Sequence, residues 1–390
     1  ANELKIDWRG LVDKYISSYR QDLDLLGISL GILDRDKEEP RATKCIEDIK
    51  KYIEALIGKG FAYVTDSGVY FSVRKFADYG KLSNQSIDQM LTGVRKEPDE
   101  TKKDALDFAL WKKSKEGEPS WPSPWGEGRP GWHIECSVMS QKYLKCDTLD
   151  IHAGGRDLIF PHHENEIAQS EAKTEKPFAK FWIHHGLLTI EGQKMAKSLG
   201  NFITIKDFID KYGGADILKL FFLSAHYAQS IDFTEEKIQT CQKQKKSLDD
   251  FFEKVDLVSK GKSTPEFSQK NKQDVDAICD KFERAMDNDF NMPQALGYLF
   301  ELRDLSFSYV GKAYKYARAK MEILFDIFGL IVKPQIKLPD RVKKEQQERE
   351  ELKKEGDYEK ADDIRNGWLR DLKLLTNDTS SGVTFTRIEE

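Results

Sequence analysis

The sequence predicts an α/β fold joined to a second, mainly α-helical part, that is, α/β plus α. Up to about residue 235, short apolar runs that suit strands alternate with stretches of helical periodicity. From about residue 236 onward, long charged segments with helical spacing dominate. Of the 390 residues, 39% are hydrophobic and 33% are charged, as in a folded globular protein of about two to four domains.

Composition restricts the classes of function only partly. The formal net charge is −5, so the chain as a whole does not resemble a nucleic-acid-binding protein, although a phosphate-binding surface needs only local positive charge. The odd number of cysteines, at 45, 136, 146, 241 and 279, predicts reduced thiols and a cytoplasmic location. We find no signal peptide and no apolar run of spanning length, so we expect no membrane partner.

Regular elements are predicted on both sides of an irregular segment. Asp7 is a candidate N-cap for the first helix. The proline-rich segment 94–130 is predicted to be an extended, irregular insertion, and 334–340 a linker. Helices are predicted at 6–26, at 44–58 and, as one or two charged helices, within 341–370, and strands at 61–64, 69–73 and 383–388.

A candidate metal site involves Cys136, His162 and Glu166. In a helix, His162 and Glu166 share one face, where an imidazole and a carboxylate can hold one Zn²⁺ ion. A thiolate from Cys136 would add a softer third ligand. In the alternative interpretation, His163 and Glu164 cap or solvate the helix, and Cys136 is a buried apolar residue.

A glycine-flanked loop, residues 192–201, carries Lys194 and Lys197. Lysines in such a loop can neutralise the charge that builds on phosphates during phosphoryl or adenylyl transfer. The alternative is an ordinary surface loop, because two lysines at this spacing are common on protein surfaces.

Several long motifs resemble those of cysteinyl-tRNA synthetases, which are class I aminoacyl-tRNA synthetases. KMAKS at 194–198 is similar to the Lys-Met-Ser-Lys-Ser motif of this class, with alanine replacing one serine. The resemblance covers nearly the whole chain. The other matching segments are GEPSWPSPWG at 117–126, GRPGWHIECS at 128–137, FPHHENEIAQS at 160–170, MDNDFN at 286–291 and GDYEKADDIR at 356–365.

One part of the family pattern is absent from the sequence. Neither the His-x-Gly-His motif nor the N-terminal cysteine that supplies another zinc ligand in this family occurs here. We therefore expect the chain to contain only part of the Rossmann-type catalytic core, and to adenylate poorly without the remainder.

The resemblance implies roles for individual residues. Lys197, assisted by Lys194, would stabilise the phosphates of ATP, which acts with Mg²⁺. One zinc ion at Cys136, His162 and Glu166 would recognise the thiol of L-cysteine. The cysteine pocket would include Trp132, His152 and Asp157, and weaker expectations for contacts with tRNA(Cys) are Tyr358, Arg365 and Arg370.

Two of these residues have a simpler interpretation. Trp132 could be a core-packing residue, and Tyr358 a helix-packing aromatic. We expect a monomer. The expected domains are the remainder of the first half of the catalytic core (1–35), a connective insertion (36–129), the second half of the core with the zinc site (130–175), a stem-contact region with the lysine loop (176–240), a helical bundle (241–333) and an anticodon-binding module (341–390).

Two other functions remain open at this point. The first is a cysteine:amino-sugar ligase of the mycothiol type, which the C-terminal extension disfavours. The second is a non-catalytic fragment that binds zinc or tRNA, which only the absence of the His-x-Gly-His motif favours.

Overall fold

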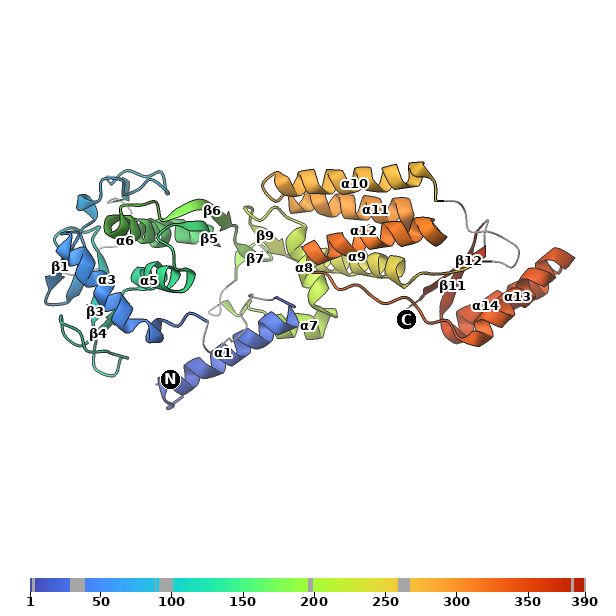
Figure 1. The fold of residues 1–390 in the computed structure, drawn as a ribbon. Helices are drawn as coiled ribbons and strands as arrows, with labels where there is room; N and C mark the ends of the chain where they lie inside the picture. Colours follow the sequence, from blue (N-terminus) through green and yellow to red (C-terminus); the bar gives the residue numbers. More distant parts are fainter. Residues whose placement is uncertain are drawn as a thin grey trace. The chain divides into compact units, whose positions relative to one another are not determined.

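The computed structural model describes residues 1, 4–28, 39–87, 89–90, 101–195, 199–258, 267–379 and 382–388. The chain divides into two compact units (Figure 1). We call Leu30–Leu187 the insertion unit, and Ala1–Ser29 with Leu188–Glu390 the helical unit. Among the described residues, no helix combines the length and hydropathy needed to cross a bilayer.

Among the described residues of the insertion unit, helices α3, α5 and α6 contact one another and pack beside two sheets. The first sheet is antiparallel with the order β1-β2-β3-β4, and β5 and β6 form a separate parallel pair. Ile49, Ile53 and Leu56 lie on one face of α3 and are fully buried in the core of this unit. The elements are α3 (Ile46–Gly58), β1 (Ala62–Thr65), β2 (Gly68–Phe71), β3 (Phe108–Lys113), β4 (Gly128–Pro130), α5 (Trp132–Leu144), β5 (Leu149–Gly155), α6 (Glu164–Thr174) and β6 (Ala179–His185).

The expectation of an irregular segment over 94–130 is wrong for residues 108–113 and 128–130. Strands β3 and β4 lie within it, and β3 pairs with β2 on one side and β4 on the other. Leu110 and Trp111 of β3 are fully buried, so this strand contributes side chains to the core as well as backbone pairing to the sheet. Pro130 ends the edge strand β4, where a residue without an N–H is tolerated. Residues 91–100 lie outside the described part of the chain.

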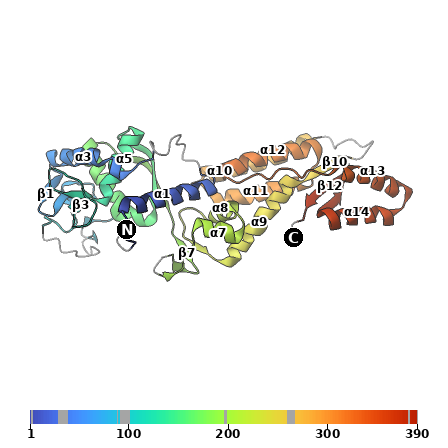
Figure 2. The same ribbon diagram turned by 90° about the horizontal axis from the view of Figure 1, so that it is seen from below.

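The helical unit combines a bundle with a small sheet. The sheet has the strand order β8-β7-β9, in which β8 pairs antiparallel and β9 pairs parallel with β7. Helices α10, α11 and α12 lie side by side in both ribbon views (Figures 1 and 2). The elements are α1 (Trp8–Leu25), β7 (Leu188–Ile190), β8 (Gln193–Lys194), α7 (Ile205–Tyr212), α8 (Ala215–Leu223), β9 (Ile231–Phe233), α9 (Glu235–Glu253), α10 (Gln269–Asp287), α11 (Met292–Phe307) and α12 (Gly311–Ile327).

The C-terminal part of this unit has a core of its own. Buried Trp368 and Phe385 meet there at a ring distance of 5.4 Å. The expected linker 334–340 has no helix or strand before α13, but Ile336 and Leu338 are buried in this core. The elements are β10 (Val255–Val258), α13 (Asp340–Glu355), α14 (Tyr358–Leu372), β11 (Leu374–Asp378) and β12 (Gly382–Arg387), with the antiparallel sheet order β10-β12-β11.

The predicted helices over 6–26, 44–58 and 341–370 and the strands near 61–64, 69–73 and 383–388 are confirmed within a few residues. Asp7 occupies the N-cap position of α1, although its side chain makes no capping hydrogen bond. Strands β10 and β11 were not predicted.

Candidate functional site

Helix α5 begins beside strand β3 and carries three candidate functional side chains. Gly131 precedes the helix, and a Cβ atom there would lie 1.9 Å from the carbonyl oxygen of Ala109. Only glycine permits so close an approach to the neighbouring strand. Trp132, His133 and Cys136 follow in the first turns of the helix, with Trp132 and Cys136 on the same face.

A second group of side chains comes from the turn before α6. Residues Ile159–His163 form a kinked turn with an extended backbone at Phe160, and from this turn His162 Nε2 reaches to 3.3 Å of Glu166 Oε1. Candidate ligand atoms of Cys136, His162 and Glu166 all lie within 4.8 Å of one another. The fold thus gathers the three residues that the sequence proposes as metal ligands.

Glu166 lies at the centre of this group and is fully buried. Its Oε2 atom lies 3.0 Å from Nε2 of His152 on β5, yet neither carboxylate oxygen accepts an aligned hydrogen bond. Burial raises the pKa of Glu166, but the adjacent His152 and His162 outweigh that effect and lower it to about 2. Glu166 is therefore a buried anion with unused acceptor capacity.

The neighbouring groups favour a divalent cation at this position. Burial lowers the pKa of His133 and of His163 to about 4, so both imidazoles are neutral at pH 7. Burial, and then the Glu166 carboxylate, raises the pKa of the Cys136 thiol to about 12. A bound cation would reverse that preference and stabilise the thiolate. Neutral imidazole, carboxylate and thiolate are ligands typical of Zn²⁺, so these residues fit a zinc ion.

Sequence reasoning missed a second group of possible ligands. His152, His163 and Glu166 also lie within 4.8 Å of one another. His163 Nδ1 lies 2.8 Å from Nε2 of His184, which faces Gly154 across the parallel strands β5 and β6. A Cβ atom at Gly154 would lie 2.7 Å from the His163 ring. The sequence feature that could have pointed to this group is the pair of histidines at 184–185, at the end of an apolar run.

The other two proposed cysteine-pocket residues differ in their surroundings. The Trp132 ring lies 4.4 Å from that of His162, and Trp132 is 59% exposed, which argues against a core-packing role. Asp157 is exposed on the short helical turn Arg156–Leu158, beside Gly155, where an added Cβ would lie 2.5 Å from Asp157 Oδ1. Asp157 does not belong to either candidate ligand group.

The lysine loop belongs to the helical unit. Lys194 is exposed at the end of β8, and its carbonyl oxygen accepts a hydrogen bond of 3.1 Å from Asn201 Nδ2. Gly192 has a φ of +75°, which favours glycine, and its N–H donates to Asp232 Oδ1. Lys197 lies outside the described residues, as do the other residues of 196–198.

The C-terminal module carries the three residues expected to contact tRNA. Tyr358 is 63% exposed at the start of α14, so its side chain is not mainly a packing residue of that helix. Arg365 pairs with Asp362 at 3.3 Å. Arg370 pairs with Asp371 at 2.8 Å.

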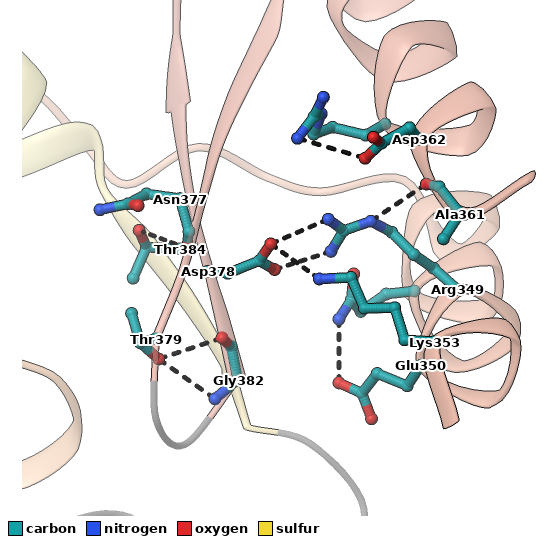
Figure 3. A network of polar contacts seen from close by, with 12 residues as sticks. Arg349, Glu350, Lys353, Ala361, Asp362, Asn377, Asp378, Thr379, Gly382 and Thr384 are labelled. Atoms are coloured by element: carbon teal, nitrogen blue, oxygen red, sulfur yellow. Dashed lines mark hydrogen bonds and ion pairs between the residues drawn. The ribbon is translucent and has the colours of Figure 1, made fainter. Parts of the chain in front are cut away.

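In the same module, Arg349 is almost fully buried although it belongs to a highly charged helix (Figure 3). Its guanidinium donates to both carboxylate oxygens of Asp378 and to the carbonyl oxygen of Ala361. Lys353 Nζ also donates to Asp378, at 2.7 Å. Helix α13 is therefore attached to α14 and β11, and is not only a solvated helix.

Comparison with known families gives two matches. A model described as "tRNA synthetases class I (C) catalytic domain" matches residues 1–243. A second, described as "DALR domain", matches residues 281–333, which include the end of α10 and all of α11 and α12.

Comparison with individual proteins gives consistent results. The chain is similar to the cysteine–tRNA ligase of Caldicellulosiruptor saccharolyticus, with 43% identity over 397 residues that cover 100% of this chain and 84% of the relative. It is 42% identical to that of Persephonella marina, over 97% of this chain and 82% of the relative. Among solved structures, Mycobacterium tuberculosis methionyl-tRNA synthetase in complex with methionyl-adenylate matches with a TM-score of 0.57 and 14% identity, over 84% of this chain and 78% of that chain, a likeness of fold.

Proposed function

The chain belongs to the cysteine–tRNA ligase family and has the class I synthetase catalytic fold, and from this premise we propose that it joins L-cysteine to tRNA(Cys) in an ATP-dependent reaction. The observation that carries the proposal is the convergence of Cys136 and His162 on Glu166, whose buried carboxylate oxygens accept no aligned hydrogen bond.

We propose that Cys136, His162 and Glu166 hold a zinc ion. When bound, zinc would coordinate a thiolate far better than a hydroxyl, and so supply a preference for cysteine over serine. Pocket shape alone separates such near-isosteres by only about 100-fold. His152 would fix the orientation of Glu166 through their 3.0 Å contact, as a positioning residue.

Trp132 and Asp157 would complete the cysteine pocket. The exposed Trp132 ring beside His162 would form a wall and exclude water from one side of the substrate. Asp157 carries a carboxylate on an exposed turn, where it could accept hydrogen bonds from the substrate ammonium group or a ribose hydroxyl.

Activation of cysteine requires its carboxylate to attack the α-phosphate of ATP and pyrophosphate to leave. The adenylate then transfers cysteine to a terminal tRNA hydroxyl. Neither step needs a strong protein base, so positioning and charge stabilisation dominate. We propose that Lys194 and Lys197 stabilise the phosphate charge that develops in the first step, with Mg²⁺ as the partner of ATP.

The C-terminal module, by proposal, contacts the anticodon side of tRNA(Cys) through Tyr358, Arg365 and Arg370. A cysteine:amino-sugar ligase is the alternative function. The match of residues 281–333 to the DALR domain and the folded module after it favour a tRNA substrate instead.

Cysteine-dependent exchange of pyrophosphate into ATP tests the proposed function. In a version that also contains the His-x-Gly-His motif, we expect exchange with cysteine and essentially none with serine, followed by transfer of cysteine to tRNA(Cys). Transfer of activated cysteine to an amino sugar, but not to tRNA, would contradict the proposal.

A further inference from the structure

The two carboxylate oxygens of Glu166 face different histidines. Oε1 lies 3.3 Å from Nε2 of His162, whereas Oε2 lies 3.0 Å from Nε2 of His152. Neither oxygen accepts an aligned hydrogen bond from a described residue. With bond lengths of about 2.0–2.1 Å and tetrahedral angles, two ligand atoms of one zinc ion lie about 3.3 Å apart. Each oxygen is therefore well placed to share a metal ion with its own histidine.

The side chains around the two oxygens form two ligand groups, and the only residue that belongs to both is Glu166. Cys136 and His162 complete the first group, and His152 and His163 complete the second. Within each group, the candidate ligand atoms lie within 4.8 Å of one another. Two-metal sites in proteins hold their ions about 3.5–4 Å apart, a separation that one bridging carboxylate can span.

The inner histidines of both groups are held by outer histidines in the same way. Nδ1 of His162 lies 2.9 Å from Nδ1 of His133, and Nδ1 of His163 lies 2.8 Å from Nε2 of His184. A histidine that binds a metal commonly uses its other ring nitrogen for such a contact, which fixes the orientation of the ring. In both inner histidines this arrangement leaves Nε2 as the ligand atom. The second group therefore has the same outer support as the first.

Strand β5 keeps space for the second group. His152 and Gly154 are alternate residues of this strand and so lie on the same face of the β5–β6 pair. A Cβ atom at Gly154 would lie 2.8 Å from Nε2 of His163, so glycine is needed where this ring packs. The rings of His152 and His163 lie 5.0 Å apart. The fold thus holds two imidazoles side by side next to a buried carboxylate.

We propose that His152, His163 and Glu166 form a second, weaker Zn²⁺ site, which shares the Glu166 carboxylate with the first. The second ion would have no thiolate ligand, and two cations that share one carboxylate repel each other. It should therefore bind only when zinc is in excess, so that purified protein still carries about one ion.

The second site would be inhibitory. With one ion bound, His152 positions Glu166; with two ions bound, His152 is a metal ligand and is lost from the cysteine pocket. Excess zinc should then oppose cysteine binding. This inference rests on the proposed function for the first zinc ion and the cysteine pocket, and adds to it a means by which zinc in excess inhibits the same site.

Cobalt(II) serves as the probe, because a thiolate ligand gives it a charge-transfer band that imidazole and carboxylate ligands do not give. Metal-free protein would be dialysed against increasing concentrations of Co²⁺ and its absorption recorded. We expect the wild type to bind two ions, the first with the charge-transfer band and the second without it. His163→Gln should bind only the first. The matched control is His185→Ala, which should bind both, because the exposed His185 belongs to neither group.

Three further variants separate the two ions. Cys136→Ala should lose the ion that gives the charge-transfer band and keep the other. Glu166→Gln should weaken both ions at least tenfold, because both use its carboxylate. His184→Gln leaves every proposed ligand in place and should weaken only the second ion, by about 10–100-fold. This last variant also keeps the test decisive if His163→Gln does not fold.

Pyrophosphate exchange measures the consequence, in a version that also contains the His-x-Gly-His motif. Zinc beyond one equivalent should raise the KM for cysteine in the wild type and much less in His184→Gln. Saturation of the wild type at one ion would overturn the inference, as would equal inhibition of the two proteins. If two ions bind in the predicted pattern but no exchange with cysteine occurs, the proposed function fails and the second metal site stands.

Discussion

Arg349 on α13 and Asp378 on β11 form a bidentate ion pair, with N–O distances of 2.8 and 2.9 Å. The guanidinium is buried, whereas the carboxylate side chain is 48% exposed. The same guanidinium also reaches the Ala361 carbonyl in α14, so one side chain connects three elements of the C-terminal module (Figure 3).

Replacing this arginine should therefore loosen the module. We expect Arg349→Met to lower the free energy of opening α13 and α14 by about 1–3 kcal/mol, because a buried set of hydrogen bonds is lost. Hydrogen exchange of amides in the two helices would measure it. The exposed Arg370→Met should change the same quantity by less than about 0.5 kcal/mol, and equal protection in all three proteins would contradict the role of Arg349.

Protonation of Asp378 should make the difference in opening free energy between the wild type and Arg349→Met depend on pH. Hydrogen bonds from Arg349, and next from Lys353, hold the pKa of this carboxyl well below its ordinary value of 3.8. Since the folded pKa is depressed, the pair stabilises the module fully above 3.8, and the contribution disappears as the pH falls through the folded pKa. The wild type and Arg349→Met should therefore converge in strongly acidic solution.

Lys197 carries the second prediction. If it stabilises the developing phosphate charge, Lys197→Ala in a version that also contains the His-x-Gly-His motif should lose roughly 3–4 kcal/mol of transition-state stabilisation in pyrophosphate exchange. Cysteine binding should stay nearly unchanged, as should exchange by Lys206→Ala, which removes an exposed lysine of α7. A large rise in the dissociation constant for cysteine with normal turnover would instead assign Lys197 to the amino-acid pocket.

Much of the fold could be predicted from the sequence. Helical periodicity revealed α1 and α3, and the resemblance identified the family that the comparisons confirm. Strand β3 was missed because nearby prolines suggested irregular chain, whereas its pairing with β2 depends on residues distant in the sequence. Strand β10 was missed for the same reason, since its partner β12 lies more than a hundred residues later.

The candidate site was predictable where its ligands lie close together in the sequence. Spacing alone linked His162 with Glu166, and the softness of a thiolate as a zinc ligand suggested Cys136 as the third. The contribution of His184 could not be found in this way, because it reaches His163 only through the parallel pairing of β5 with β6. Burial of Arg349 was equally hidden, since a charged helix suggests a solvated surface.

Tyr358 provides a test of anticodon contact. We expect Tyr358→Ala to weaken tRNA(Cys) binding by about 1–3 kcal/mol, through lost base stacking, and Tyr358→Phe to retain most of the affinity. Point substitution is preferable to deleting 341–390, because β10 pairs with β12 and would lose its partner. An anticodon-base change should weaken binding by the wild type and have little further effect on Tyr358→Ala. Equal responses would contradict this contact.

Gly154 tests the packing around the histidines. In Gly154→Ala the new methyl group would meet the His163 ring at 2.7 Å, so the ring or strand must shift. We expect a stability loss of about 1–3 kcal/mol and weaker metal retention. Gly367→Ala in α14 is the control, because its methyl group would enter open space and alanine favours a helix. Thermal melting that ranks the two variants alike would contradict the packing argument.

The most direct test of the zinc site is elemental analysis of purified Cys136→Ala and Cys146→Ala. Both cysteines are free and partly buried, but only Cys136 lies with His162 and Glu166. We expect about one zinc per chain in the wild type and in Cys146→Ala, and a large loss of zinc from Cys136→Ala. Equal zinc content in the two variants would contradict it.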